Sequence, residues 1–244
     1  MCHCQAQSAS VRQHGQTSLA RGTRSSTSYL KPHSLKPVAM PRQNRVTPFG
    51  EIVAVPERGT MMGNRGRLHD LQGRIRRTWQ VKRWLVCLLE FHGRQRTVMG
   101  PNSYTELFFL DEATGLAAGH RPCFECRRKA FEAFAVAFAS GNRIALPTAG
   151  MIDERLHAER IGAKNLKKTF RRRADDLPEG TFVVVDGAAH LIWRGRLLRW
   201  SPGGYIASRR FSKLDQVTVL TPRSTVRAIR AGYRPSVHSS ADIQ

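Results

Sequence analysis

Acidic residues are scarce in this chain. Its 244 residues include 18 Asp and Glu against 40 Lys and Arg, which gives a formal net charge of +22 at pH 7. A small domain stays soluble with a net charge of magnitude about 2 to 8. The excess therefore predicts a polyanionic partner, and nucleic acid is the first candidate. The alternative is that an arginine-rich proteome accounts for the charge.

Long apolar segments and several familiar motifs are also absent. No run approaches the roughly 18 apolar residues of a transmembrane helix, and residues 1–40 lack the apolar core of a secretory signal. The sequence contains no P-loop, no Gly-x-Ser-x-Gly and no dinucleotide-binding fingerprint. We therefore expect a cytoplasmic protein that has no membrane partner.

Cysteine is rare as well. The five cysteines are odd in number and lack the spacing of a disulfide framework: Cys2, Cys4, Cys87, Cys123 and Cys126. This usage favours a reducing compartment, and it favours metal or thiol chemistry over disulfide bridges.

The composition divides the chain into three parts. Residues 1–40 are expected to form a disordered tail, because residues 1–39 hold five basic residues, no acid and many Ser, Gln and His. The alternative is an upstream start codon, with Met40 opening the protein. Residues 41–145 are predicted to form a metal-binding domain, and residues 146–244 a β-rich domain with a terminal helix.

The hydrophobic pattern predicts an α+β fold, with a β-hairpin and helices around the metal-binding module. In the first half it indicates a strand at 51–55, a glycine-bearing loop at 59–66, and a hairpin of strands 83–91 and 94–99 that turns at His92–Gly93. Helices are predicted after the N-cap Asp111, over 126–141 and over 153–168. Beyond these, a β-meander with strands at 182–185, 190–193, 197–200 and 217–220 leads to the terminal helix.

Cys123 and Cys126 form a Cys-x-x-Cys pair that follows Pro122, at the predicted start of a helix. This spacing presents two sulfurs to one point, which is half of a thiolate metal centre. The rival interpretation is that the pair is vestigial or a redox dithiol.

The other ligands must come from elsewhere, because a closed zinc site takes four nitrogen or sulfur ligands. We predict Cys87 as the third ligand and His92 as the fourth, with His69 and His120 as alternatives for the fourth. In the rival interpretation Cys87 is a buried core residue, as free cysteines often are.

The stretch that ends in this pair is Leu107-Phe-Phe-Leu-Asp-Glu-Ala-Thr-Gly-Leu-Ala-Ala-Gly-His-Arg-Pro-Cys-Phe-Glu-Cys-Arg. It resembles the second half of the Ada-type metal-binding domain, which occurs in bacterial DNA alkylation-repair proteins and as an accessory module on some nucleases. The resemblance covers residues 104–128 and implies a small α/β zinc module, with Cys123 and Cys126 as two of its four zinc cysteines. The upstream Cys-x-x-x-Cys of the repair proteins, whose first sulfur accepts a methyl group from DNA phosphotriesters, is missing here. Its absence argues against methyl transfer.

Basic residues cluster at two places. Three lie beside the cysteine pair, two lie at the end of the helix predicted over 153–168, and three follow it: Arg127, Arg128 and Lys129, then Lys167 and Lys168, then Arg171, Arg172 and Arg173. We expect both groups to contact nucleic-acid phosphates, although a solvated basic face is the simpler alternative.

The sequence thus predicts a zinc-binding protein with a structural metal centre that binds DNA or RNA. The alternatives are a nucleic-acid-processing hydrolase, a repair-type thiol transferase that uses Cys87 or Cys123, and a structural zinc fold for protein contacts.

Overall fold

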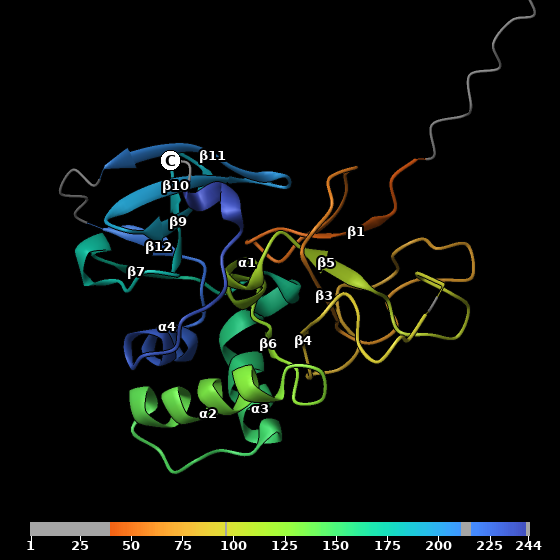
Figure 1. The fold of residues 1–244 in the computed structure, drawn as a ribbon, viewed down its shortest axis with the longest axis horizontal. Coiled ribbons are helices and arrows are strands. Elements are labelled where there is room, and N and C mark those ends of the chain that lie inside the picture. The colour runs from red at the N-terminus through yellow and green to blue at the C-terminus, as the bar shows by residue number, and fades with distance from the viewer. Residues whose placement is uncertain (1–39, 96, 211–215, 243–244) are drawn as a thin grey trace, which may run out of the picture. The chain divides into compact units, whose positions relative to one another are not determined.

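A computed structural model describes residues 40–95, 97–210 and 216–242, which form a mixed α+β fold with two sheets and four α-helices (Figure 1). Residues 1–39, which include the predicted tail with Cys2 and Cys4, lie outside the described residues. Within the described ranges, no helix is both long enough and apolar enough to cross a bilayer.

The first sheet contains the strands of the N-terminal half. They are β1 (Gln43–Val46), β2 (Ile52–Ala54), β3 (Met61–Asn64), β4 (Leu85–Cys87), β5 (Leu107–Phe109) and β6 (Arg121–Pro122). Their order in the sheet is β2-β1-β5-β3-β4-β6. β3 is antiparallel to both of its neighbours, whereas β4 and β6 run parallel.

Two predictions for this sheet are wrong. β3 lies inside the segment that was predicted as a glycine-bearing loop. Gly63 lets β3 approach β4, because a Cβ at this position would lie 1.9 Å from the carbonyl oxygen of Leu85, and the same glycine weakened the strand pattern. The hairpin around His92–Gly93 does not form: the described residues of 94–99 contain no strand, and β4 pairs with β3 and β6 instead.

The second sheet contains the strands of the C-terminal half. They are β7 (Phe170–Arg172), β8 (Phe182–Val185), β9 (Ala188–Trp193), β10 (Arg196–Ser201), β11 (Gly204–Arg210) and β12 (Val217–Val219). Successive antiparallel pairing from β8 to β11 builds a meander, as predicted, and β12 and β7 extend it on the β8 side. β11 was not predicted as a strand, because it follows the turn-like Ser-Pro-Gly-Gly segment.

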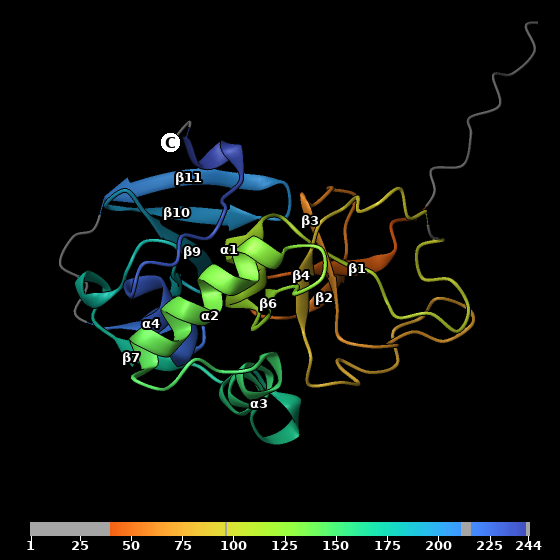
Figure 2. The same ribbon diagram turned by 60° about the horizontal axis from the view of Figure 1, so that its bottom comes forward.

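The helices are α1 (Glu112–Ala117), α2 (Arg128–Asn142), α3 (Ala149–Arg160) and α4 (Arg223–Arg230). The predicted N-cap is confirmed, since the Asp111 side chain accepts a hydrogen bond from the backbone N–H of Thr114. The helix predicted over 153–168 is displaced, because α3 ends where Ile161 turns extended. Figure 2 shows α2 beside α4, and the two helices share a buried cluster.

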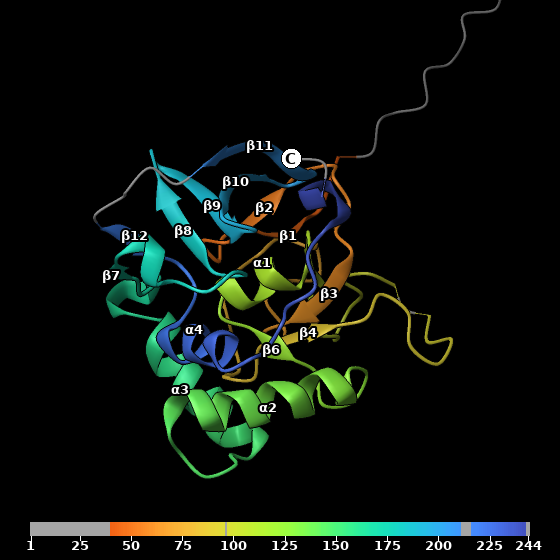
Figure 3. The ribbon, with the colours of Figure 1, turned by 60° about the vertical axis from the view of Figure 1, so that its left-hand side comes forward.

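Helix α1 is the central element of the described fold (Figure 3). All six of its residues are buried. Ala113 and Ala117 belong to the cluster on the second sheet, and Leu116 belongs to the cluster of α2, α3 and α4. Ala118, its C-cap, belongs to a cluster on the first sheet. The boundary predicted at residue 145 therefore runs through shared clusters.

Candidate metal centre

Two parallel strands bring the cysteines to one edge of the first sheet. Cys87 is the last residue of β4, and Cys123 directly follows β6. The register pairs Val86 with Pro122, so the two cysteines leave the sheet side by side. The N–H of Cys123 donates to the carbonyl oxygen of Val86 at 2.9 Å and extends this pairing. The chain then turns and presents Cys126 shortly before α2 begins.

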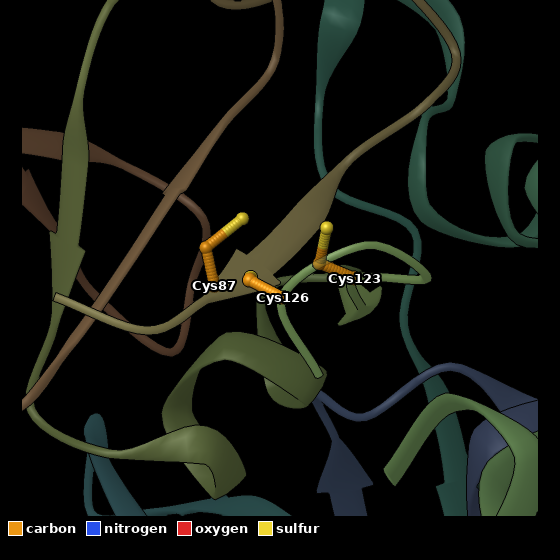
Figure 4. Close-up of side chains that lie close together, drawn as sticks. All are labelled: Cys87, Cys123 and Cys126. Atoms are coloured by element: carbon orange, nitrogen blue, oxygen red, sulfur yellow. The ribbon is translucent and has the colours of Figure 1, made fainter. Parts of the chain in front are cut away.

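Figure 4 shows the three side chains grouped at this edge. Their sulfur atoms all lie within 4.8 Å of one another. Zinc–sulfur bonds are about 2.3 Å long, so the sulfurs of a tetrahedral zinc site lie about 3.8 Å apart. Cys87 and Cys123 are buried, and Cys126 is half-buried. The structure thus brings the three predicted cysteines together in a cluster that can hold a metal ion.

The three thiols do not ionise equally. The pKa of Cys123 is lowered, first by a hydrogen bond from Cys126 and then by one from Cys87, with backbone N–H groups of Cys126 and Glu125 adding to the effect. The pKa values of Cys87 and Cys126 are raised, in both cases first by the hydrogen bond with Cys123. One thiolate is favoured here and three are not. A bound cation would supply the positive charge that allows all three sulfurs to ionise.

The predicted histidine ligands do not join the cluster. Among the described residues, the group of mutually close ligand atoms consists of the three sulfurs alone. His92 lies exposed in a turn, with its ring against Phe91. Both ring nitrogens of His69 are occupied, Nδ1 by the Thr105 hydroxyl at 2.6 Å and Nε2 by the carbonyl oxygen of Gly100 at 3.2 Å.

His120 is also excluded by its hydrogen bonds. Its Nε2 accepts from Nε of Arg65 at 2.9 Å, and its Nδ1 lies 3.0 Å from the carbonyl oxygen of Leu85. Burial, followed by the charge of Arg65, lowers the pKa of His120 well below its usual value. This neutral, fully buried imidazole supports the sheet and has no lone pair left for a metal.

Comparison with protein-family models, curated proteins and solved structures finds no match. The resemblance to the Ada-type domain therefore rests on the quoted sequence stretch. The chemistry of the site has to be argued from its own ligands and surroundings.

The three cysteines line a cavity of about 720 Å³. This volume falls in the range of about 300 to 1,000 Å³ that is typical of small-molecule sites. The apolar and aromatic part of the lining includes Met62, Leu85, Val98, Tyr104, Phe108 and Phe124. A ligand in this cavity would lie next to the metal position.

The basic residues beside the cysteines do not form one exposed group. Arg127 turns inwards, and its Nη1 lies 2.8 Å from Oε1 of Glu112, with both side chains almost fully buried. Arg128 is exposed and lies over the ring of Phe124, at 4.0 Å from the ring centroid, but its Nη1 also pairs with Oε1 of Glu132 at 3.7 Å. Lys129 is exposed. Within this group, Lys129 is exposed without a carboxylate partner among the described residues, whereas Arg128 would have to share its charge with Glu132.

The second basic group is divided in the same way. Lys167 points inwards, and its Nζ donates to the carbonyl oxygen of Ala117 at 2.6 Å. Arg172 and Arg173 are exposed but pair with Asp176 and Asp175. The two that remain exposed without a carboxylate partner among the described residues are Lys168 and Arg171, which donate to backbone carbonyls.

One polar residue of the cavity was missed from the sequence. Glu106 precedes β5, is only 2 % exposed, and lines the same cavity as the cysteines. The sequence contains a signal for this placement, because residues two apart on a strand share a face, and Glu106 therefore faces the same side as Phe108.

Proposed function

We propose that this chain is a zinc-dependent enzyme of the hydrolase class, with its metal held by Cys87, Cys123 and Cys126. The observation that carries the proposal is a three-sulfur cluster that opens on a cavity of about 720 Å³. Structural zinc sites are closed by four protein ligands, whereas catalytic sites use three and leave a position for water or substrate. Zinc in such a site lowers the pKa of its bound water to about 7 and polarises carbonyl groups.

The donor set supports zinc over harder cations. Three thiolates are soft ligands, which suit zinc, copper(I) or iron–sulfur chemistry and disfavour magnesium and calcium. The resemblance of residues 104–128 to the Ada-type zinc module points the same way. The hydrolase class is favoured over a structural zinc fold because a structural site is closed by a fourth protein ligand. Here the three cysteines border a cavity from which a substrate can reach the fourth position.

Metal analysis and cobalt substitution test the proposal. We expect one zinc per chain, and loss of that zinc in Cys123→Ser. In the cobalt form, three thiolates and one exchangeable position predict visible bands that shift when cyanide is added. Absorption bands that stay in place when cyanide is added would indicate a closed four-ligand site and would overturn the catalytic assignment. The full-length double variant Cys2→Ser/Cys4→Ser should give the same spectrum as the wild type, because the metal is assigned to Cys87, Cys123 and Cys126.

Nucleic-acid binding is a second candidate function, favoured by the net charge of +22 and by the exposed Arg128, Lys129, Lys168 and Arg171. Such binding is carried by phosphate contacts, so its affinity should fall steeply with salt. Each lost contact should reduce the slope of log affinity against log salt by about 0.7 to 0.9. Filter binding of single- and double-stranded DNA and RNA between 50 and 200 mM salt, roughly the range in which such losses are large, gives this slope. Absence of affinity at low salt would remove the candidate.

A further inference from the structure

Glu106 carries a buried oxygen that no group in the described part of the chain satisfies. Its Oε2 accepts a hydrogen bond from the N–H of Met99 at 2.7 Å. Its Oε1 is buried and has no hydrogen-bond partner among the described residues. Leaving a buried acceptor unpaired costs about 1 to 3 kcal/mol, and more for a charged group. A ligand that donates to Oε1 would recover this free energy.

The sheet register places Glu106 on the face that carries the metal ligands. Phe108 of β5 pairs with Met62 of β3, which pairs with Cys87 of β4. Side chains that pair directly across antiparallel strands share a face, and so do residues two apart along a strand. Glu106 therefore faces the cavity two strands from Cys87, a lateral separation of roughly 10 Å. It is too far away to be a ligand and is well placed to hold the other end of a bound molecule.

The charges around the cavity exclude an anionic ligand at this depth. Three thiolates and one divalent cation sum to a charge of −1 by elementary chemistry, and Glu106 adds a carboxyl group to the lining. Arg121 also lines the cavity, but its guanidinium is fully engaged by the Asp153 carboxylate at 2.7 and 2.9 Å and by the carbonyl oxygen of Pro122. The charge at the bottom of the cavity is thus opposite in sign to that of the basic outer surface.

The other lining cations are also offset. Arg94 pairs with Glu125 at 2.7 Å, and the lining contains one further exposed cation, Arg83, and one further exposed acid, Glu90. The remaining walls near Glu106 include the aromatic side chains of Tyr104 and Phe108, with Arg45 over the Phe108 ring at 4.8 Å from its centroid, and aromatic walls suit a flat ring.

We infer that the cavity binds a small heterocycle with an exocyclic amino group, of the nucleobase class, and that Glu106 Oε1 accepts a hydrogen bond from that ligand. This inference rests on the proposed function, because it assigns the substrate class of the same site. An unpaired base presents an N–H donor for Glu106 Oε1 and a flat face for the aromatic walls. Phosphates of a nucleic acid would stay outside, where the exposed arginines and lysines lie.

The test uses the full-length chain loaded with zinc, with metal content measured for every sample. Calorimetric titration compares cytidine with uridine and adenosine with inosine, two pairs that differ in the amino group, and includes inorganic phosphate. We expect the amino nucleosides to bind at least tenfold more tightly than their partners, and phosphate not to bind in the cavity. Glu106→Gln keeps an acceptor for Met99 and should weaken amino-nucleoside binding at least tenfold. Glu90→Gln, at an exposed carboxylate of the same lining, is the matched control.

The outcomes separate this inference from the proposed function. Equal affinities within each nucleoside pair, or unchanged affinity in Glu106→Gln, would overturn the inference while a stoichiometric exchangeable metal leaves the enzyme proposal intact. Absence of zinc would instead overturn the enzyme proposal. If Glu106→Gln does not fold, Glu106→Asp, which keeps the charge but withdraws the carboxylate by one methylene, must show the same loss.

Discussion

Arg127 offers the sharpest test of how this chain uses its positive charge. The sequence places it with Arg128 and Lys129 as a phosphate ligand, whereas the structure buries it against Glu112. Its Nη1 lies 2.8 Å from Oε1 of Glu112, and the two side chains are 9 % and 2 % exposed. Removing one partner of a buried ion pair costs about 3 to 5 kcal/mol, since the other charge is left uncompensated.

The structure lowers this figure for Arg127→Met. Glu112 would keep hydrogen bonds from the Tyr233 hydroxyl and from the N–H and hydroxyl of Ser236. We therefore expect a loss of about 2 to 4 kcal/mol in the free energy of unfolding. Urea denaturation of the zinc-loaded protein measures it as a lower midpoint with an unchanged slope.

Lys129→Met is the matched control for this measurement. Lys129 lies two residues further on and is exposed, so its replacement should change stability by no more than about 0.5 kcal/mol. The two variants should behave oppositely in nucleic-acid binding, where only the Lys129 variant reduces the salt slope. Equal stabilities of Arg127→Met and Lys129→Met would refute the buried ion pair.

Three further predictions address the fold, the metal and the pH response. Gly63→Ala should destabilise the chain by more than about 3 kcal/mol and lower its zinc content, because the new Cβ would meet the Leu85 oxygen at 1.9 Å between β3 and β4; wild-type stability in urea would contradict this. Cys87→Ser should lose zinc while keeping its far-ultraviolet circular dichroism, whereas a merely buried core cysteine would leave the metal content unchanged. Burial lowers the pKa of Lys167 from an ordinary 10.5 to about 7, so between these values the unfolded chain binds more protons and stability should rise with pH, by at most about 1.4 kcal/mol per unit. Lys167→Met should flatten that rise between pH 7.5 and 9, roughly the lower half of this window, and identical slopes in both proteins would count against it.

The parts of the fold that sequence could predict are those set by local pattern. The apolar stripe of Phe131, Phe134, Ala135 and Phe138 predicted α2, and each of these side chains is buried. Glycine turns between short predicted strands predicted the meander. Asp111 was identified as an N-cap because a short polar side chain before an Ala-rich run satisfies the first free N–H groups. Such signals lie within a few residues of one another.

The parts that sequence could not predict depend on distant partners. Cys87 has a local pattern that suits a hairpin, yet its strand is completed by the two-residue β6, which is too short to show any periodicity. The same holds for charge. Arg127 finds its carboxylate 15 positions earlier, and Lys167 finds its carbonyl 50 positions earlier. A count of basic residues therefore overstated the exposed basic surface.

The turn that carries Cys123 and Cys126 is held in place by residues of the second half of the chain. This contact matters for the prediction that residues 41–145 form a separate zinc module. Arg127, next to Cys126, is fixed by Glu112, and Glu112 in turn accepts from Ser236. Its neighbour Asp111 accepts from the Tyr205 hydroxyl at 2.7 Å and from the N–H of His238.

Two consecutive acids, the N-cap Asp111 and the first α1 residue Glu112, thus join the Cys-x-x-Cys turn to β11 and to the C-terminal segment. Acidic residues are scarce in this chain, and these two lie where both sheets and the Cys-x-x-Cys turn meet. The cysteine geometry is therefore a property of the whole described fold. A fragment that ends at residue 145 would lose the Tyr205 and His238 donors to Asp111 and the Tyr233 and Ser236 donors to Glu112.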